Sequence, residues 1–342
     1  MKLISTLSAL LFLSINAFSA NIAFIGDVNF TGRISDAIVK DGISWPFEKV
    51  AKELSGADFT VANLESPLGV GGYKYCPKRV YFKADPNYAD ALCLAGIDLV
   101  SLANNHALDY GPEVLEQTKQ ELTKRGILYA GIVENNSHIN KPVIVEINKT
   151  KIGFLSFCNA CPQEFAPTNV TMGVSVGYSK TMVTQIKQLK PKVDFVVVMP
   201  HWGTEYAGPD INQKRQAQKA VDAGADLVIG HHPHVVQQAV KIGDSIVAYS
   251  LGNFLFPMRW ETSMDSMILN VLLEKGRSIQ WNYLPVSLEN NRPEILQPWL
   301  KGWNTEKEAR ISYIVHNEYQ FEKERANDRR WTAEKFVERL GR

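Results

Sequence analysis

The sequence predicts an α/β fold with a largely parallel sheet, and two observations support this prediction. Short apolar runs rich in Val, Ile and Phe alternate with amphipathic stretches of about 10 to 15 residues, which is the pattern of alternating strands and helices. The composition is that of a globular protein, with 45% hydrophobic and 21% charged residues, which argues against disorder. The length of 342 residues fits either two domains or one large α/β domain with an appendage.

Six short apolar runs are predicted to form buried strands, because β-branched and large apolar residues dominate them and polar or glycine residues follow them. Two further runs, 143–147 and 152–157, are joined by four residues and predict a β-hairpin, so the sheets are expected to be mixed. The six predicted strands span residues 22–25, 59–62, 99–103, 195–199, 227–229 and 246–250.

Two segments between these strands carry clear helix signals. Residues 112–125 begin with Pro112, which is favoured at a first helical position, and stop before Gly126. Residues 212–223 stop before Gly224 in the same way.

The composition changes near residue 300. Residues 301–342 interleave many charged residues with aromatic ones, and opposite charges three and four positions apart favour an exposed helix whose aromatic side chains pack on the body. We therefore predict a main domain over residues 21–290 and a charged helical C-terminal extension over 291–342. Residues 1–20, before the main domain, are predicted to be a signal peptide for the reasons that follow.

The N-terminal 20 residues have one Lys, an apolar stretch and the ending Ala-Phe-Ser-Ala, which predicts a secretory signal peptide cleaved after Ser19. The alternative is an uncleaved membrane anchor, because an apolar stretch of about 18 residues is near the lower limit for spanning a bilayer. We expect a periplasmic or cell-surface protein.

The mature chain is predicted to have no net charge. Loss of Lys2 lowers the 37 basic residues to 36, which equals the 36 acidic ones. This neutral balance argues against a general nucleic-acid binder.

The four cysteines are interpreted for an oxidising compartment. We expect a disulfide between two of Cys76, Cys158 and Cys161. A zinc site would need a second ligand pair, and a redox motif would need a helix start where Pro162 stands. Cys93 is predicted to be a buried free thiol.

Polar residues follow each of the six predicted strands. Because the carboxyl ends of parallel strands line the ligand crevice of an open α/β sheet, we expect these clusters to converge on one edge of the sheet. Five of the seven histidines lie in them. The clusters are Gly26-Asp27-Val28-Asn29, Asn63-Leu64-Glu65, Asn104-Asn105-His106 with Asp109, His201-Trp202-Gly203-Thr204-Glu205, Gly230-His231-His232-Pro233-His234 and Leu251-Gly252-Asn253.

Carboxylate, amide and imidazole groups at strand ends are the donors that one or two divalent transition metals require. Imidazole with carboxylate suits Zn²⁺, Mn²⁺ and Fe, whereas Mg²⁺ and Ca²⁺ prefer oxygen ligands. A single histidine at a strand end would be explained by a structural hydrogen bond, and an Asn-Asn pair by a turn. Their joint occurrence in this order favours a metal site.

Six motifs carry a resemblance to a known family: GDVNF at Gly26, NLESPL at Asn63, SLANNHALDYG at Ser101, HWGTEY at His201, GHHPHVVQ at Gly230 and YSLGNF at Tyr249. Residues 21–257 resemble the bacterial capsule-synthesis CapA, or poly-γ-glutamate biosynthesis, family, which is similar to the calcineurin-like metallophosphoesterases. The resemblance implies a four-layer α/β/β/α sandwich with mixed sheets.

The resemblance also implies roles for individual residues. Asp27 would bind a first metal, Glu65 would bridge two metals, and His106 would stabilise or protonate the leaving oxygen. The chain departs from the phosphoesterase pattern at Asn29, where a His is usual, and at Glu65, where an Asp is usual, so the number of ions stays open at one or two. The remaining implied metal ligands are Asn105, His201, His232 and His234.

Several neighbours have alternative roles. Asp109 would orient His106 or cap the helix that starts at Pro112. Glu205 would act as a general base, as a partner of His201, or as a plain surface residue. His231 would face away from the metal, with its ring hydrogen-bonded to the sheet. Candidates for substrate contact are Asn29, Asn253, Arg33 and Lys83, with Lys78, Arg79 and Arg259 as further members of a basic rim or as ordinary solvated side chains.

Three functions are compatible with these residues. The first is a protein of capsule or poly-γ-glutamate biosynthesis or export, whose partners are an anionic exopolymer or its precursor and membrane polymer-synthesis proteins. The second is a metal-dependent hydrolase of phosphoesters or γ-glutamyl amides. The third is a polymer-binding module that has kept the fold without the metal. This function is favoured by Asn29 and Glu65, which depart from the phosphoesterase pattern. Whether the protein is an enzyme is left open.

Overall fold

The computed structural model describes residues 19–134, 140–177, 179–257, 261–296, 310–312 and 314–315. Residues 1–18 of the predicted signal peptide, Arg259, and the aromatic residues of the predicted extension lie outside the described residues, as do His138 and His316. In the described part, no helix is both long and apolar enough to cross a bilayer.

The first sheet has eight strands, with β1 at its centre. β1 is buried along almost its whole length, which explains its continuous apolar sequence. Its partners on one side are parallel, and β14 on its other side is antiparallel. The path runs β16 (Glu294–Ile295), β15 (Gln280–Ser287), β14 (Asp265–Glu274), β1 (Ser19–Val28), β2 (Phe59–Leu64), β3 (Leu99–Ser101) and β4 (Leu128–Ala130), and β13 (Asn253–Leu255) pairs in parallel with the end of β1.

The second sheet has six strands. Its four inner strands are parallel, and an antiparallel strand closes each side. The order is β11 (Ala239–Ile242), β12 (Ser245–Ala248), β10 (Leu227–Ile229), β9 (Phe195–His201), β7 (Thr150–Cys158) and β6 (Val143–Ile147), and a separate small pair joins β5 (Ile132–Val133) and β8 (Gly173–Val174).

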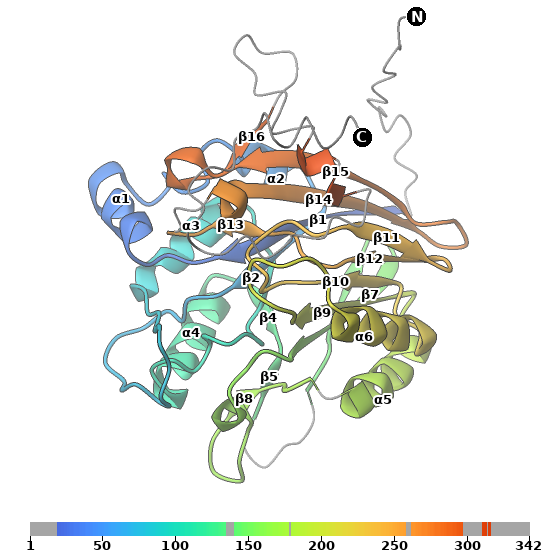
Figure 1. Cartoon of the computed structure of the whole chain (residues 1–342), viewed down its shortest axis with the longest axis horizontal. Coiled ribbons are helices and arrows are strands. Elements are labelled where there is room, and N and C mark those ends of the chain that lie inside the picture. The colour runs from blue at the N-terminus through green and yellow to red at the C-terminus, as the bar shows by residue number, and fades with distance from the viewer. Residues whose placement is uncertain are drawn as a thin grey trace, which may run out of the picture.

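The two sheets pack face to face, and helices cover their outer faces (Figure 1). Side chains of both sheets, such as Phe24 and Phe154, form the core between the sheets. Figure 1 shows the two groups of helices on different sides of the molecule. The helices are α1 (Arg33–Asp41), α2 (Ala51–Leu54), α3 (Ala89–Leu94) and α4 (Pro112–Lys124) on the first sheet, and α5 (Ser179–Leu189) and α6 (Ile211–Asp222) on the second. The predicted four-layer sandwich with mixed sheets is confirmed.

The predicted elements are found with small differences in length. The six strands, the hairpin and both helices are present, although β3 ends at Ser101 and β12 at Ala248. α6 starts one residue before the predicted boundary because Asp210 and Gln213 form a capping box there.

The prediction that all six polar clusters lie on the edge of one sheet is wrong. β1, β2 and β3 belong to the first sheet, whereas β9, β10 and β12 belong to the second. The clusters meet because the two sheets are stacked with these ends on the same side. Hydrophobic periodicity identifies strands but not their partners, so the sequence pattern did not separate the sheets.

Residues beyond position 290 also contribute to the body. Ile311, Ile314 and Val315 are buried in the core between the sheets. The Arg310 guanidinium makes two hydrogen bonds with the Asp265 carboxylate, from Nε to Oδ2 at 2.6 Å and from Nη2 to Oδ1 at 2.7 Å. The residues around Arg310 are thereby fixed to β14.

The cysteines follow the prediction in part. Cys158 and Cys161 form a disulfide with a Cα–Cα distance of 5.6 Å, which confirms a bond between two of the three candidates. Cys76 is a buried thiol, and burial raises its pKa. Cys93 is exposed, so its predicted burial is wrong: α3 directs Ala91 and Leu92 to the core and Cys93 to solvent.

Candidate metal centre

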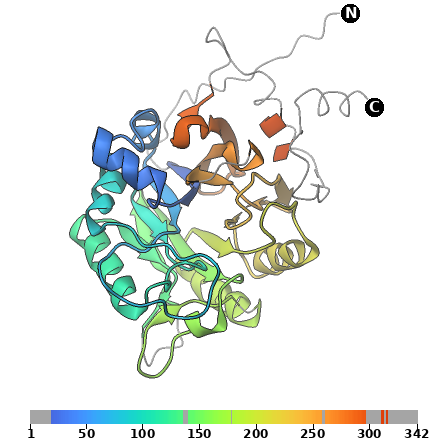
Figure 2. The same ribbon diagram turned by 60° about the vertical axis from the view of Figure 1, so that its left-hand side comes forward.

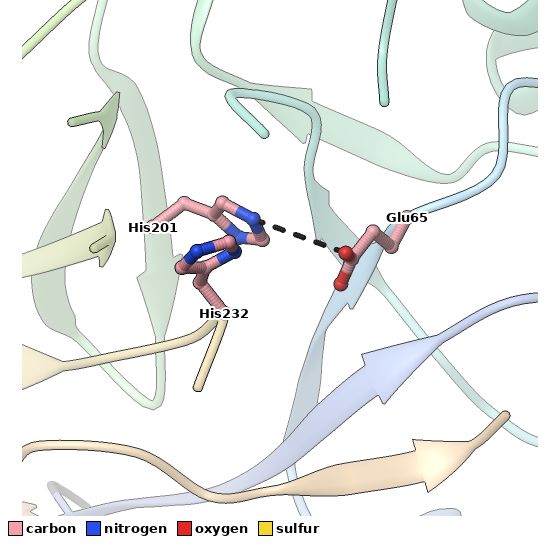
Figure 3. A group of neighbouring side chains, drawn as sticks. All are labelled: Glu65, His201 and His232. Carbon is pink, nitrogen blue, oxygen red and sulfur yellow. Dashed lines mark ion pairs between the residues drawn. The ribbon is translucent and has the colours of Figure 1, made fainter. Parts of the chain in front are cut away.

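Buried carboxylates and imidazoles from both sheets meet at one point. Asp27 lies near the end of β1 and Glu65 directly after β2, and both are 0% exposed. His201 ends β9, and His232 and His234 follow β10; all three are buried. Figure 3 shows the rings of His201 and His232 beside each other, with the Glu65 carboxylate opposite.

Two groups of three ligands share Glu65. Asp27, Glu65 and His234 form one, and Glu65, His201 and His232 form the other; within each, one ligand atom per residue lies within 4.8 Å of the others. Glu65 Oε1 lies 3.6 Å from His234 Nε2 and 3.9 Å from His201 Nε2. Asp27 Oδ2 lies 3.5 Å from His234 Nδ1. The Glu65 carboxylate is therefore shared by two sets of potential metal ligands.

A strained turn after β10 presents two of the imidazoles. His232 and His234 have φ angles of 98° and 57°, which non-glycine residues rarely adopt. Gly230, which precedes them in the chain, has no room for a side chain. A Cβ atom there would lie 2.0 Å from the Tyr249 carbonyl oxygen and 2.5 Å from Trp202 Nε1. Such backbone strain persists only where the surroundings enforce it, and it is concentrated at functional sites.

The donors fit a divalent cation. Among the described residues, Glu65 Oε1 and His232 Nδ1 have no hydrogen-bond partner although both atoms are buried, which is costly unless something else binds them. Burial raises the pKa of Asp27 to about 7 and the pKa of Glu65 well above its usual value, and the neighbouring Asp27 charge contributes to the second shift. A bound cation would offset the cost of burying two carboxylate charges, and it would accept the lone pairs of the atoms that lack a hydrogen bond.

The histidines are suited to metal binding because they are neutral. Burial lowers the pKa of His232 to about 3 and the pKa of His234 to about 4, and it lowers the pKa of His201 well below its usual value. Metal ligation requires this uncharged imidazole.

Asn105 also reaches the centre. Its Oδ1 atom lies 2.9 Å from His201 Nε2, which places the predicted second-metal ligand beside the second ligand group. Asn63, which the sequence motif included without a role, donates from Nδ2 to Asp27 Oδ1 at 2.8 Å and lies 3.4 Å from Glu65 Oε2. Asn63 therefore holds the two carboxylates in place.

His106 lies in a separate cluster beside the ligands. Its Nδ1 atom is 2.6 Å from Asp109 Oδ2, the contact expected for the first of the two roles considered for Asp109, whereas α4 has no side-chain cap. The sequence predicts that Lys78 belongs to a basic rim or is an ordinary solvated side chain. In the structure its ammonium contacts Asp109 Oδ1 and the Asn105 carbonyl and lies 3.2 Å from His106 Nδ1. The Phe82 ring packs on His106 with centroids 4.1 Å apart. No spacing signal ties Lys78 to Asp109, which is 31 residues away in the chain.

Two amides near the centre are held by local contacts. Asn29 Oδ1 accepts hydrogen bonds from the Thr31 backbone amide at 2.9 Å and the Thr31 hydroxyl at 2.7 Å. Its buried Nδ2 has no hydrogen-bond partner in the part of the chain that the structure describes. Asn253 Oδ1 lies 2.9 Å from His234 Nδ1, and Asn253 Nδ2 donates to the carbonyls of His234 and Ser263. Asn253 thereby orients a predicted metal ligand.

The remaining predicted residues differ in their contacts. Arg33, at the start of α1, places Nη1 3.5 Å from Asn291 Oδ1. Lys83 donates to the Gly71 carbonyl and lies 4.1 Å from the Tyr110 ring centroid. His231 directs Nε2 to the Ile25 carbonyl at 3.3 Å, as expected for a ring that faces the sheet. Glu205 is exposed and forms a third possible ligand group with His232 and His234.

Comparison with known proteins agrees with the motifs. The family described as "Bacterial capsule synthesis protein PGA_cap" matches residues 21–258. The PGA biosynthesis protein CapA of Bacillus subtilis (strain 168) is 28% identical over 274 residues, which cover 79% of this chain and 72% of that protein. The capsule biosynthesis protein CapA of Bacillus anthracis is 29% identical over 278 residues, which cover 79% and 68%.

Solved structures resemble the chain in fold at low identity. A hypothetical protein from Thermus thermophilus matches with a TM-score of 0.50 and 15% identity, over 78% of this chain and 99% of that chain. The calcineurin-like phosphoesterase YfkN from Bacillus subtilis matches with a TM-score of 0.49 and 15% identity, over 80% and 92%. Since the family match covers residues 21–258 of 342, the chain belongs to the bacterial capsule synthesis protein family PGA_cap, as its six motifs predict.

Proposed function

We propose that this protein acts in the biosynthesis or export of an anionic exopolymer, as a metal-dependent hydrolase whose site lies where strand ends of the two sheets meet. The observation that carries the proposal is the position of Glu65, whose carboxylate is shared by two groups of potential ligands. A site for one or two ions of Zn²⁺, Mn²⁺ or Fe agrees with this mixture of imidazole and carboxylate. Family membership supports the polymer context.

The residues around the ligands support hydrolysis. A divalent cation at Glu65 would supply Lewis acidity toward a phosphoryl or carbonyl oxygen. Asp109 and Lys78 engage His106 on the Nδ1 side, which leaves Nε2 as the ring atom that donates a proton to the leaving group. Glu205 is the exposed carboxylate beside His232 and His234 and is proposed as a general base. The bond cleaved is a phosphoester or a γ-glutamyl amide.

Turnover with and without metal tests this proposal. Purified mature protein is incubated with a generic phosphodiester, or with a γ-glutamyl oligopeptide, in the presence of Mn²⁺ or Zn²⁺ or of a chelator. We expect hydrolysis that the chelator abolishes and that His106→Ala reduces by about 10²- to 10⁴-fold. A metal-replete protein that cleaves neither substrate contradicts the hydrolase proposal.

A second candidate, a polymer-binding module without metal, is favoured by Asn29. Its amide oxygen is turned to Thr31, so this position supplies no ligand. In the producing cell, His232→Ala separates the two candidates. Loss of polymer output indicates that the ligand set is required, whereas unchanged output favours the binding module.

The location is proposed from the N-terminal sequence. Residues 1–20 would direct export to the periplasm or cell surface, where the protein would meet the polymer and the membrane proteins that make it. Mass spectrometry of the exported protein tests this: a chain that starts at Ala20 supports cleavage, and a membrane-bound chain that retains Met1 supports the anchor.

A further inference from the structure

A segment beside the metal centre carries four positive charges and no acidic residue. We call residues 72–83, with the sequence GYKYCPKRVYFK, the basic loop. Its cations are Lys74, Lys78, Arg79 and Lys83, interleaved with three tyrosines and one phenylalanine. The whole chain has 37 basic and 36 acidic residues, so attraction for an anion has to come from a local concentration of charge such as this one.

The inner side of the basic loop forms part of the wall of the site. Lys78 contacts Asp109 and the Asn105 carbonyl. The Phe82 backbone amide donates to Asp109 Oδ2 at 2.7 Å, and the Phe82 ring packs on His106. The inner side of the loop therefore lies directly against His106 and Asp109.

The outer side of the loop presents two of its other cations to solvent. Lys74 and Arg79 are exposed, and Tyr73 is 60% exposed. The Lys74 ammonium lies 4.6 Å from the Tyr81 ring centroid, a contact that orients the charge without neutralising it. Among the residues that the structure describes, no carboxylate forms a salt bridge with Lys74, Arg79 or Lys83. Figure 2 shows the long segment between β2 and α3, which contains the basic loop, crossing the front of the molecule.

We propose that the basic loop binds a flexible polymer that carries one carboxylate on each repeat unit, and that it leads this chain to the metal centre. The proposal rests on the proposed function and adds the surface that recognises the substrate. Lysine ammonium groups pair with single carboxylates, and the exposed tyrosine offers an apolar face to the backbone between them. Cations that already lack an acidic partner lose no existing salt bridge when the polymer binds.

Polymer binding by charge-neutralised variants tests the proposal. Labelled poly-γ-glutamate is titrated with the metal-loaded mature protein, and fluorescence anisotropy gives the affinity at low and high salt. The test variant is Lys74→Gln/Arg79→Gln. The matched control is Lys187→Gln/Lys192→Gln, which removes the same charge from exposed residues of α5 and of the turn before β9, at the opposite end of that strand from His201.

We expect the test variant to bind poly-γ-glutamate about tenfold more weakly and with a shallower salt dependence, since rim charges act through screened attraction. The control should bind like wild type, and both variants should keep the wild-type metal content and melting temperature. Wild-type affinity in the test variant overturns the proposal. So does a wild-type protein that binds no poly-γ-glutamate at low salt, or one that binds a polyphosphate of the same length more tightly. Turnover of a small substrate reports on the metal centre independently, because that substrate does not span the basic loop.

Discussion

His106 Nδ1 and Asp109 Oδ2 lie 2.6 Å apart, and both side chains are almost completely buried. The contact fixes which ring nitrogen of His106 is left for a substrate. The two residues are three positions apart in sequence, so one turn after β3 places both. This pair is the part of the site whose disturbance should affect the reaction without affecting the ligands.

Replacement of Asp109 by Asn tests whether the reaction can be impaired while metal binding is kept. The amide keeps the size of the side chain but removes the charge that holds His106 and Lys78. We expect turnover of a small phosphodiester to fall by about 10²-fold or more, while the metal content stays at the wild-type value. A variant that loses metal and turnover together would show that Asp109 supports the ligands themselves.

Removal of the Asp27 charge should have opposite effects with and without metal. The pKa of Asp27 is raised to about 7 by burial, so its ionisation destabilises the folded, metal-free chain as the pH rises from about 4 through 7. In the presence of a chelator at pH 8, Asp27→Asn should therefore melt at a higher temperature than wild type, and the difference should shrink at pH 5.5. With metal bound, the same variant should melt lower, because it has lost a ligand. Equal melting temperatures under all these conditions would contradict the assignment.

The buried pair of Asp265 and Arg310 should stabilise the fold. Asp265→Asn leaves the guanidinium without its carboxylate in a buried place, and such a loss costs about 3–5 kcal/mol. The exposed pair of Lys275 and Asp194, at 2.8 Å, is the control: Lys275→Gln should cost less than about 1 kcal/mol. Urea unfolding at neutral pH measures both values. Similar small losses in the two variants would mean that the residues around Arg310 contribute little to stability.

The two free thiols should differ in reactivity. Cys93 is exposed, whereas Cys76 is buried with a raised pKa, and thiolate is the reactive form. Native protein treated with iodoacetamide at pH 8 should gain one adduct, located at Cys93 by peptide mapping. A second adduct should appear only after denaturation, and two more only after reduction of the disulfide. Rapid labelling of Cys76 in the native protein would contradict its burial.

That these carboxylates and imidazoles lie close together could be predicted because strand ends have a strong sequence signal. An apolar run that stops at Asp27, at Asn63-Leu64-Glu65 or at His201 marks both the strand and its functional end. Which strands share a sheet could not be predicted, because pairing depends on contacts between residues far apart in the chain. The long strands β14 and β15 were not predicted, although their apolar residues complete the core between the sheets.

Contacts between distant loops could not be predicted from the sequence either. In the sequence, nothing distinguishes Lys78 from the other cations near it, and only the folded chain brings it to Asp109. The exposure of Cys93 depends on how α3 is rotated against the sheet, and its surrounding apolar run gave no sign of that. Sequence patterns thus located the donors, while the fold identified the residues that hold them.

The metal content of protein purified without chelators shows whether Glu65 and the neighbouring imidazoles bind a metal ion. Elemental analysis is applied to the wild-type chain, to Glu65→Gln and to the control Glu113→Gln, which alters an exposed residue in the first turn of α4. We expect one or two transition-metal ions per chain in the wild type and in the control, and a clear loss in Glu65→Gln, since both ligand groups share that carboxylate. A wild-type content below about 0.2 ion per chain, far less than the one or two ions of a working site, would contradict the account.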